Sequence, residues 1–253
     1  MSVDNPIQAA GNGTPLSLWQ ASTELAQLAS ITRDALVPPG NRLVVVAPHP
    51  DDEVLGCGGL LSTFSGCEHA VLLISVTDGE GSHPGSHAWP SERLRTQRPL
   101  ESQAALAALG LTPARVAWQR LQLADSAVGE HERELAYALV RSLRPGDRLL
   151  TTWRLDGHCD HEAVGRACAQ AAQTVGATLI EVPIWAWHWA RPHDPRLPWH
   201  RARKFILSPE QLASKRSAIA AHASQLEADG ERAPVLSETT LQRLLQPFEL
   251  VFL

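Results

Sequence analysis

Short apolar runs without polar alternation recur along the chain, and they limit its fold more than any other feature. The first is Arg-Leu-Val-Val-Val-Ala at residues 42–47, and similar runs follow at residues 70–77, 115–118, 148–152 and 178–182. Such runs are typical of strands buried on both faces, as in a parallel sheet. Between them are helix-like stretches at residues 91–109, 130–143 and 160–175. We therefore expect an α/β fold with a Rossmann-like, mostly parallel sheet and helices on both faces.

The two ends of the chain follow this alternation less regularly. Residues 1–37 are expected to form a leader with one helix at residues 16–33, which Pro-Pro-Gly at residues 38–40 would end. Beyond Val182 the pattern weakens, with strands expected at residues 202–207 and 248–253 and helices at residues 210–222 and 238–246. The prediction is a single domain at residues 38–253 with a smaller, irregular C-terminal portion.

Composition and charge exclude several classes of protein. The 253-residue chain has a formal net charge of −5 and no Lys or Arg run, which argues against nucleic acid as a partner. No apolar stretch is long enough to span a bilayer, and the first residues lack the basic and apolar regions of a signal peptide. The four cysteines form no Cys-x-x-Cys pair. We therefore expect free thiols in a cytoplasmic protein.

Three polar clusters stand directly after expected strands. They are His-Pro-Asp-Asp-Glu at residues 49–53, Asp-Gly-Glu-Gly-Ser at residues 78–82 and Asp-Gly-His-Cys-Asp-His at residues 156–161. In open α/β sheets, ligands bind in the crevice beyond the carboxyl ends of the strands. Because three loops at that edge can converge, we expect these clusters to share one site. No Gly-x-Gly-x-x-Gly follows the first strand, so the usual dinucleotide fingerprint is missing.

The first cluster has the residue types of a metal site. His49, Asp51, Asp52 and Glu53 follow a buried strand, where carboxylates carry a desolvation cost unless a cation or donors compensate. Imidazole and carboxylate suit Zn²⁺, which in catalytic sites takes three protein ligands and keeps one position for water. The third cluster would supply another imidazole. A lone histidine is more often structural, and one aspartate could instead cap the helix expected at residues 54–65, but capping does not explain three acidic residues together.

The third cluster places its histidines at the start of a helix. Asp160 is a suitable N-cap residue for the helix expected at residues 160–175. His161 would lie in the first turn, on the inward face that Val164 marks. His158 would lie on the loop before the helix, near the metal without being restricted to binding it.

Taken in order, these motifs resemble the PIG-L, or LmbE-like, family of zinc-dependent N-acetylglucosaminyl deacetylases. The resemblance rests on the His-Pro-Asp-Asp-Glu sequence and on the later His-x-Asp-His at residues 158–161. Further matches are Arg98-x-x-Glu101, Leu123-x-Asp125 and Arg144-Pro145. It extends from about residue 43 to residue 189, which is most of the chain.

The resemblance implies how the metal centre is built. His49, Asp52 and His161 would be the zinc ligands, although iron or cobalt could occupy the same ligands. Asp51 would be the general base that acts on water, because only one of the two adjacent carboxylates can bind the metal directly.

The resemblance also implies residues that serve the substrate. Protonated His158 would polarise the acyl oxygen, and Asp160 would orient His158. Arg98 and Asp125 match positions that contact the sugar. Glu53 matches the motif and is expected to have a supporting role.

Two segments keep alternatives open. Cys159 stands where the family usually has proline; we expect a buried, inert thiol, although it could compete for metal. Trp185, Trp187 and Trp189 would face one side of an extended chain and could stack on a sugar. Packing against the C-terminal region is the expectation for most of them, because tryptophan buries a large area.

A loop rich in Gly, Ser and Pro is expected at residues 81–89. Its position beyond a strand makes it a candidate substrate lid. His83 and His87 on this loop, and Glu80 before it, are further candidate substrate contacts.

These observations predict a hydrolase that removes an N-acetyl group from an N-acetylglucosaminyl-type small molecule or glycoconjugate. Two other functions remain open: a zinc amidase or esterase for a non-carbohydrate acyl compound, and a metal-dependent sugar-binding module without catalysis. Asp51 argues against the module, because binding needs no base beside the ligands. The sequence specifies neither the group behind the sugar, nor the acyl length, nor the oligomeric state.

Overall fold

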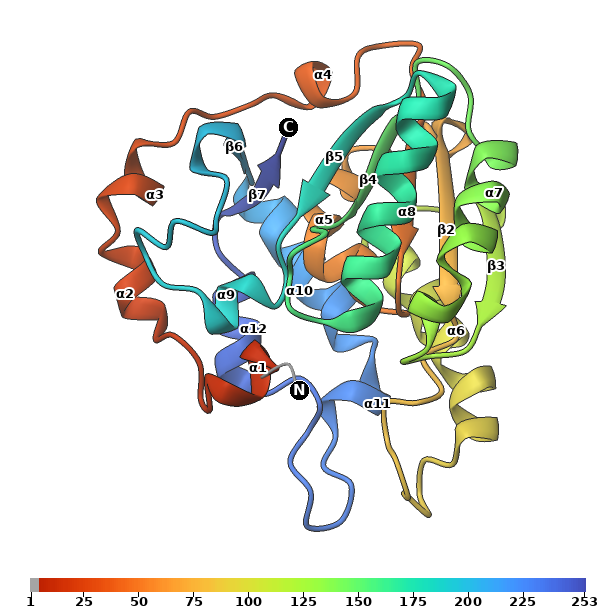
Figure 1. Ribbon diagram of the computed structural model, residues 1–253, viewed down its shortest axis with the longest axis vertical. Coiled ribbons are helices and arrows are strands. Elements are labelled where there is room, and N and C mark those ends of the chain that lie inside the picture. Colours follow the sequence, from red (N-terminus) through yellow and green to blue (C-terminus); the bar gives the residue numbers. More distant parts are fainter. Residues whose placement is uncertain (1–4) are drawn as a thin grey trace.

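The computed structural model describes residues 5–253 and places seven strands in one sheet (Figure 1). The strands are β1 (Leu43–Ala47), β2 (Val71–Thr77), β3 (Ala117–Leu123), β4 (Arg148–Thr152), β5 (Thr178–Val182), β6 (Ala202–Ile206) and β7 (Phe248–Phe252). Their order across the sheet is β3-β2-β1-β4-β5-β7-β6. The strands from β3 to β5 are parallel, whereas β7 is antiparallel to β5 and β6. The predicted α/β fold with a mostly parallel sheet is confirmed.

The central strands are apolar because helices cover both faces of the sheet. Every residue of β1 and β2 is buried. Leu43, Val45 and Ala47 of β1 belong to one apolar cluster, whereas Val44 and Val46 belong to another. Successive side chains of a strand point to opposite faces, so the two clusters lie on opposite sides of the sheet. This double burial accounts for the unbroken apolar run in the sequence.

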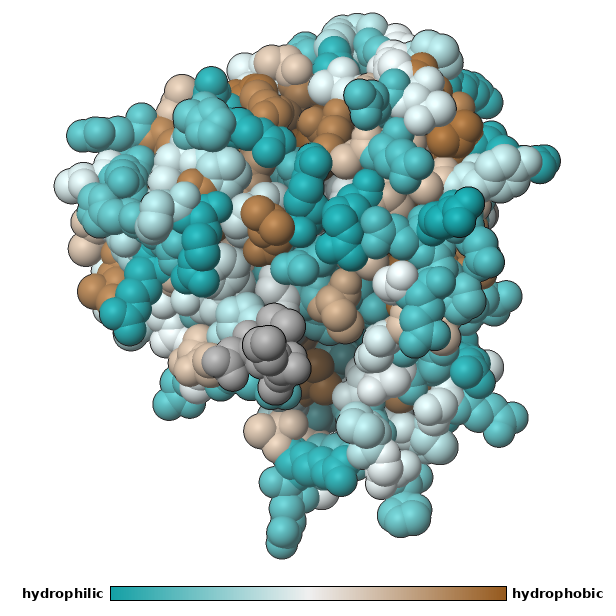
Figure 2. Space-filling view, in the orientation of Figure 1, coloured by the Kyte–Doolittle hydropathy of each residue, from teal (hydrophilic) through white to brown (hydrophobic). Residues whose placement is uncertain are grey.

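The longer helices form the two layers that cover the sheet (Figure 1). They are α5 (Asp52–Ser62), α6 (Ser91–Ala108), α7 (Glu132–Ser142), α8 (Cys159–Val175) and α10 (Pro209–Ala220). Apolar residues of α7 and α8 join one cluster, and those of α5, α6 and α10 join the other. Within residues 5–253, no helix is both long and apolar enough to cross a membrane. On the face seen in Figure 2, hydrophobic residues form small groups separated by hydrophilic ones.

Shorter elements complete the C-terminal portion and the connections. The helices are α9 (Ala186–Trp189), α11 (Ala223–Leu226) and α12 (Glu238–Leu244). Single 3₁₀ turns lie at Glu68–Ala70, Pro113–Arg115, Val128–His131 and Trp199–Arg201. The strands and helices predicted after Val182 are confirmed as β6, β7, α10 and α12.

The edge strand β3 shows where the apolar pattern fails. A strand was expected at residues 115–118, but β3 extends to Leu123. Gln119, Arg120 and Gln122 within it are exposed. An edge strand with one face in water carries polar residues, so most of β3 does not form an apolar run.

The first part of the described chain forms several short helices instead of the single helix predicted at residues 16–33. They are α1 (Pro6–Ala9), α2 (Leu16–Gln20), α3 (Thr23–Gln27) and α4 (Arg33–Leu36), coloured red in Figure 1. The long helix is wrong because Ser22 starts a new one: its side chain accepts a hydrogen bond from Leu25 N–H at 3.1 Å.

The same segment covers the edge of the sheet at β6. Ile31 N–H donates to Lys204 O at 2.9 Å, and Lys204 N–H donates to Ala29 O at 3.0 Å. This parallel bridge extends the sheet beyond β6. The boundary between residues 1–37 and 38–253 stays a prediction, and the first four residues of that leader lie outside the described part of the chain.

A buried ion pair joins the amino ends of β1 and β4. The Asp147 carboxylate accepts hydrogen bonds from Arg42 Nε at 3.1 Å and Arg42 Nη2 at 2.6 Å. It also accepts one from Arg144 N–H at 2.7 Å. Both oxygens of this buried carboxylate therefore have donors, and a fixed cation balances its charge.

Candidate metal and catalytic site

Connections that follow β1, β2 and β4 meet beyond the carboxyl ends of these strands. His49, Ser82 and His158, one from each connection, line the same cavity. The predicted convergence of the three polar clusters is therefore confirmed. Asp51, directly before α5, has a φ of 138°, which non-glycine residues rarely adopt. This sharp turn brings His49 and Asp52 together, with His49 N–H donating to Asp52 Oδ2 at 2.9 Å.

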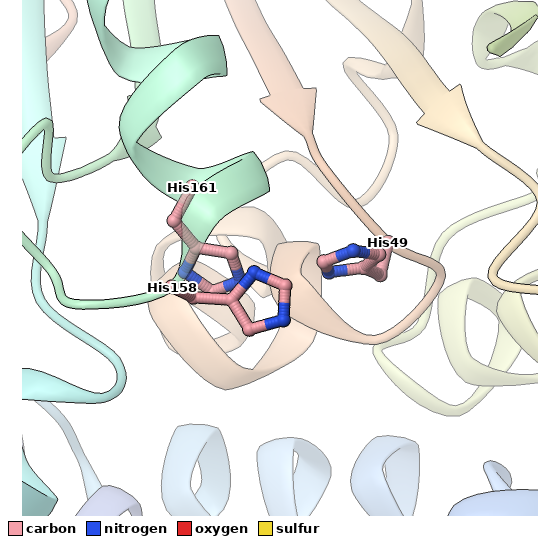
Figure 3. Close-up of side chains that lie close together, drawn as sticks. All are labelled: His49, His158 and His161. Carbon is pink, nitrogen blue, oxygen red and sulfur yellow. The ribbon is translucent and has the colours of Figure 1, made fainter. Parts of the chain in front are cut away.

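The structure brings together the three residues expected to bind metal. Asp52 Oδ2 lies 3.2 Å from His49 Nδ1 and 3.3 Å from His161 Nε2. Figure 3 shows the rings of His49, His158 and His161 gathered at one place, and one nitrogen of each lies within 4.8 Å of the others. His161 Nε2 is buried and has no hydrogen-bond partner among residues 5–253. A buried ring nitrogen that faces a carboxylate and other imidazoles fits a metal ligand.

The charges around these ligands favour a cation. Burial lowers the pKa of His161, but Asp52 and Asp156 outweigh burial and raise this pKa to about 9. Burial also opposes the charge of Asp52, yet His161 and His49 hold its pKa well below the usual range. Burial lowers the pKa of His49, but hydrogen bonds to nearby carboxylates raise it well above the usual value. The acidic groups thus stabilise positive charge at this point, whether a proton or a metal carries it.

Asp51 has the properties of a base that works near neutral pH. Burial raises its pKa to about 7, against the opposing effect of Arg98 and with a contribution from Asp52. Arg98 is buried and donates to Asp51 Oδ2 at 3.2 Å, to Pro50 O at 2.7 Å and to Gly79 O at 2.8 Å. The guanidinium therefore lines the cavity and also fixes the turn that carries Asp51.

Glycine is required at position 79 for this arrangement. Gly79 has a φ of +68°, and a side chain there would collide with the Arg98 guanidinium. The Asp-Gly-Glu cluster thus contributes to the site through its backbone. Glu80 itself contacts Arg95 at 3.3 Å and does not line the cavity.

His158 caps α8 and faces the cavity. The helix begins at Cys159, so the prediction of Asp160 as its N-cap is wrong: His158 Nδ1 accepts a hydrogen bond from Asp160 N–H at 3.3 Å. Burial, with His161 and His49 nearby, lowers the pKa of His158 to about 3. A pKa this low favours the uncharged ring, and the hydrogen bond to Nδ1 then places its proton on Nε2. The protonated ring that the resemblance implies stays a prediction.

Asp160 and Asp125 support His49 from the other side of its ring. Asp160 Oδ2 lies 3.1 Å from His49 Nε2, and its carboxylate accepts hydrogen bonds from Ser126 N–H at 2.7 Å and Val128 N–H at 3.2 Å. Asp125 Oδ1 lies 3.3 Å from the same His49 nitrogen, and Asp125 Oδ2 accepts from Gly81 N–H at 2.8 Å. The Asp160 side chain thus contacts His49, while its link to His158 runs through the backbone.

The cavity has a volume of about 240 Å³ and two unlike walls. The polar wall consists of Ser82, Arg98, Asp125 and Ser126. The apolar wall consists of Leu55, Ile184, Trp185, Val235 and Leu236. A pocket of this kind suits a small molecule with both hydroxyl groups and an apolar face.

The tryptophan segment is not the extended chain that the sequence suggested. It turns as α9, so the three indoles do not share one side as they would in an extended chain. Trp187 packs edge-on against Trp19 at 4.9 Å between ring centroids, and Trp189 stacks on Trp153 at 6.3 Å. These two indoles therefore serve packing, although Trp19 and Trp153 lie outside the C-terminal region. Toward that region, Trp187 lies 6.3 Å from Phe248 between ring centroids. Trp185 lines the cavity.

Glu53 and Cys159 lie beside the ligands. Glu53 accepts hydrogen bonds from Ser102 Oγ at 2.7 Å and Asp51 N–H at 3.0 Å, so it holds the turn before α5. Cys159 is exposed, contrary to the buried thiol expected, because it occupies the outer side of the first turn of α8. Its Sγ lies 3.8 Å from Asp160 Oδ1.

Two loops project beyond the site, residues 78–90 in yellow and residues 226–237 in blue in Figure 1. They are joined where Arg232 Nη1 donates to Pro84 O at 2.7 Å. His83 is buried against Ser82, with 2.9 Å between Nδ1 and Oγ, and neither His83 nor His87 lines the cavity. Val235 and Leu236, on the second loop, do line it.

Sequence reasoning missed the apolar wall except for Trp185, and it missed the contacts of Asp156. Val235 and Leu236 lie in an irregular stretch with no motif, and only the fold brings them to the metal ligands. Asp156 was part of the third cluster, and its position two residues before His158 could have suggested a partner for one of the histidines.

Comparison with known proteins adds a family relationship. Residues 44–172 match the family model described as PIG-L, GlcNAc-PI de-N-acetylase. A 1D-myo-inositol 2-acetamido-2-deoxy-α-D-glucopyranoside deacetylase 2 from Catenulispora acidiphila is 32% identical, over 53% of this chain and 52% of the relative. The enzyme of the corresponding name from Corynebacterium urealyticum is 30% identical, over 82% of this chain and 78% of the relative. The chain thus spans about half of the first relative and most of the second.

The fold is also found among solved structures. A triple mutant of a deacetylase from the teicoplanin biosynthetic pathway superimposes with a TM-score of 0.62. The two chains are 21% identical, and the match covers 84% of this chain and 97% of the other. At this identity the likeness concerns the fold alone.

Proposed function

The chain belongs to the PIG-L family of deacetylases, and on this premise we propose that it is a zinc-dependent hydrolase that removes the acetyl group from an N-acetylglucosaminyl-type substrate. The observation that carries the proposal is the unpartnered, buried Nε2 of His161, which faces Asp52. Asp51, a second carboxylate with a pKa of about 7, lines the same cavity as His161. A metal site next to an available base is what amide hydrolysis by activated water requires.

His49, Asp52 and His161 are the proposed metal ligands, and zinc is the proposed metal. Two imidazoles and one carboxylate are a donor set that Zn²⁺ accepts in catalytic sites. When bound, the metal would supply Lewis-acid polarisation of the acyl group and would lower the pKa of water. Asp125 and Asp160 would hold the far side of the His49 ring, since both contact its Nε2.

Asp51 is the proposed general base. Its pKa of about 7 lets it exist as a carboxylate at neutral pH and still accept a proton from the attacking water. Arg98 would keep the carboxylate in place through its 3.2 Å contact with Oδ2. The hydroxyl of the water adds to the acyl carbon, and the proton ultimately reaches the amine nitrogen as the C–N bond breaks.

His158 is the proposed hydrogen-bond donor to the acyl oxygen. Because Nδ1 accepts from Asp160 N–H, the neutral ring carries its proton on Nε2, on the side away from the helix. A donor aimed at developing negative charge contributes about 3–4 kcal/mol to catalysis in comparable sites. Asp160 would orient this ring through the same backbone contact. Either Asp51 or His158 could deliver the proton to the amine.

The two walls of the cavity support a sugar as the substrate. Asp125 and Arg98 on the polar wall are the proposed contacts for sugar hydroxyls, and Trp185 on the apolar wall offers an aromatic face. The cavity of about 240 Å³ leaves room for little more than one amino sugar, so a group linked to it would extend past the rim. The named relatives act on an acetamido sugar linked to inositol, and we extend this substrate class to the chain.

The decisive experiment measures acetate released by the zinc-loaded protein. The panel contains N-acetylglucosamine, several of its glycosides and an acylated amine without a sugar. Asp51→Asn is the matched control, because it preserves the size of the side chain and removes the base. Release from the sugar compounds that chelation abolishes, zinc restores and Asp51→Asn lacks would support the proposal.

Two results would contradict it. Release from the amine without a sugar, and none from the acetylglucosaminyl compounds, would favour a zinc amidase for another acyl substrate. Tight binding of a sugar compound without release of acetate from any of them would favour a binding module.

A further inference from the structure

Asp156 is a fully buried carboxylate for which the proposed reaction has no role. It lies in the connection between β4 and α8, in the same polar cluster as His158 and His161. Its oxygens accept one hydrogen bond from a ring nitrogen and three from backbone N–H groups. Four donors match the acceptor capacity of a carboxylate, so each of them depends on this one side chain.

The first donor is a proposed metal ligand. Asp156 Oδ2 lies 2.8 Å from His161 Nδ1. Because an ionised carboxylate can only accept there, a ring with one proton keeps it on Nδ1. The lone pair then lies on Nε2, the nitrogen that is 3.3 Å from Asp52 and has no hydrogen-bond partner among the residues described. Asp156 therefore selects the tautomer that can bind a metal.

The other three donors belong to the turn after β5. Asp156 Oδ1 accepts from Ile184 N–H at 3.0 Å and from Ala186 N–H at 2.9 Å, and Oδ2 accepts from Trp185 N–H at 2.9 Å. Ile184 and Trp185 form part of the apolar wall of the cavity. The position of this wall thus depends on the carboxylate that orients His161.

We infer that Asp156 is a positioning residue with two linked tasks: it fixes the metal-binding tautomer of His161, and it holds Ile184 and Trp185 in the substrate wall. The inference rests on the metal site of the proposed function and assigns a role to an acidic residue that neither binds metal nor touches substrate. Because Asp156 holds both groups, a shift of Ile184 and Trp185 would also shift the ring of His161.

Asp156→Asn tests these two tasks, because it keeps the size of the side chain and changes only the groups that accept hydrogen bonds. An asparagine offers one accepting oxygen and one NH₂ group that donates. An NH₂ group facing His161 Nδ1 favours the tautomer with the proton on Nε2, which cannot bind the metal through Nε2. We expect zinc affinity to fall about 10- to 100-fold, measured by competition with a chelator. At saturating zinc, KM should remain raised, because the turn at residues 184–186 has lost an acceptor. Zinc affinity within twofold of the wild type would overturn the inference.

Asp147→Asn is the matched control at the opposite end of the same sheet. It also removes a buried carboxylate that holds one side chain and one backbone N–H group, Arg42 and Arg144. We expect it to lower the melting temperature and to leave zinc affinity unchanged. An equal loss of zinc affinity in both variants would mean that instability is the cause, and the inference would be wrong.

A spectroscopic measurement on the wild type does not depend on any variant folding well. In zinc-loaded protein with ¹⁵N-labelled histidine, the His161 ring should carry its proton on Nδ1, with Nε2 bound to metal. His161→Gln, which removes the signal, provides the assignment. A ring that carries its proton on Nε2 would overturn the inference.

The zinc affinity and the protonation of the His161 ring can be measured without turnover, so the two proposals can fail separately. Wild-type protein that releases no acetate, while Asp156→Asn still lowers zinc affinity, contradicts the proposed function and supports the role of Asp156. Acetate release by the wild type, with unchanged zinc affinity in Asp156→Asn, supports the proposed function and contradicts the role of Asp156.

Discussion

Buried carboxylates are paired with cations differently at the two ends of the parallel strands. At the amino ends, the Asp147 carboxylate is matched by the Arg42 guanidinium at 2.6 Å. At the carboxyl ends, several buried acids gather within a short distance of the histidines: Asp51, Asp52, Glu53, Asp156 and Asp160. Arg98 contacts one of them, Asp51. One end is balanced by a permanent cation, whereas the other carries more acidic groups than the contact with Arg98 can balance.

The difference separates a structural edge from a functional one. A matched pair becomes costly only when one partner is removed, and the intact pair has no remaining charge to offer an ion. A surplus of carboxylates costs stability unless protons, donors or an exchangeable cation offset it. Surplus buried charge at the carboxyl ends of strands is therefore a physical mark of a site.

The largest effect is expected from His161→Ala. The variant removes the nitrogen that faces Asp52, so zinc binding should be lost. Several kcal/mol of transition-state stabilisation are lost with the metal, and activity should fall about ten-thousandfold or more. Metal content and acetate release from the same sample provide the measurement. Bound zinc in the purified variant would show that His161 is not needed to bind the metal.

Asp51→Asn should have the next largest effect, and of a different kind. Asp51 is proposed as the base and not as a ligand, so zinc content should stay near the wild-type level. Loss of a general base lowers kcat by about a hundred- to a thousandfold. Steady-state kinetics at saturating zinc would measure this. A variant that retains more than a tenth of the wild-type kcat would exclude Asp51 as the base.

Arg42→Met should affect stability alone. The change leaves Asp147 buried without its cation, and breaking a buried pair in this way costs about 3 kcal/mol. Urea unfolding of the two proteins gives the difference, and chelator competition should give the same zinc affinity for both. If zinc affinity also fell, the two edges would not be independent.

His222 should give the smallest effect, which depends on pH. It lies between α10 and α11, and neither ring nitrogen has a hydrogen-bond partner within residues 5–253. Burial, with a contribution from Arg98, lowers its pKa from 6.5 to about 3. The unfolded chain therefore takes up a proton that the folded protein does not, and stability falls as pH drops from 6.5 toward 3.

His222→Leu removes this group and its proton. Between pH 6.5 and about pH 5 the wild type should lose about 2 kcal/mol more than the variant, from 1.4 kcal/mol per pH unit. Urea unfolding at the two pH values measures the difference. Equal losses in both proteins would show that His222 is protonated in the folded state or is not buried.

The central fold was predictable because burial on both faces leaves a mark in the sequence. Residues 43–47 are apolar without a gap, since helices cover both sides of β1. β3 was predicted too short because exposed residues such as Arg120 interrupt its pattern. The helix expected at residues 16–33 failed on local chemistry, since Ser22 caps a new helix there.

The residue types of the site could be predicted from the sequence better than the contacts between them. The residue types at His49, Asp52 and His161 pointed to a metal, and in the structure one nitrogen of each histidine lies within 3.3 Å of Asp52 Oδ2. Which carboxylate supports which ring depends on long-range packing, so Asp160 against His49 and Asp156 against His161 could not be derived from spacing. Trp185 entered the cavity wall alone because α9 turns where an extended chain was expected.

The pairing of residues 29–31 with β6 also bears on how separate copies of the protein meet in solution. A bare edge strand offers unpaired N–H and C=O groups to any other chain that approaches it. Here Ala29 and Ile31 occupy those of Lys204, and they lie outside the stretch that matches the family. Residues 29–31 therefore leave no main-chain N–H or C=O group of Lys204 free to pair with a second copy.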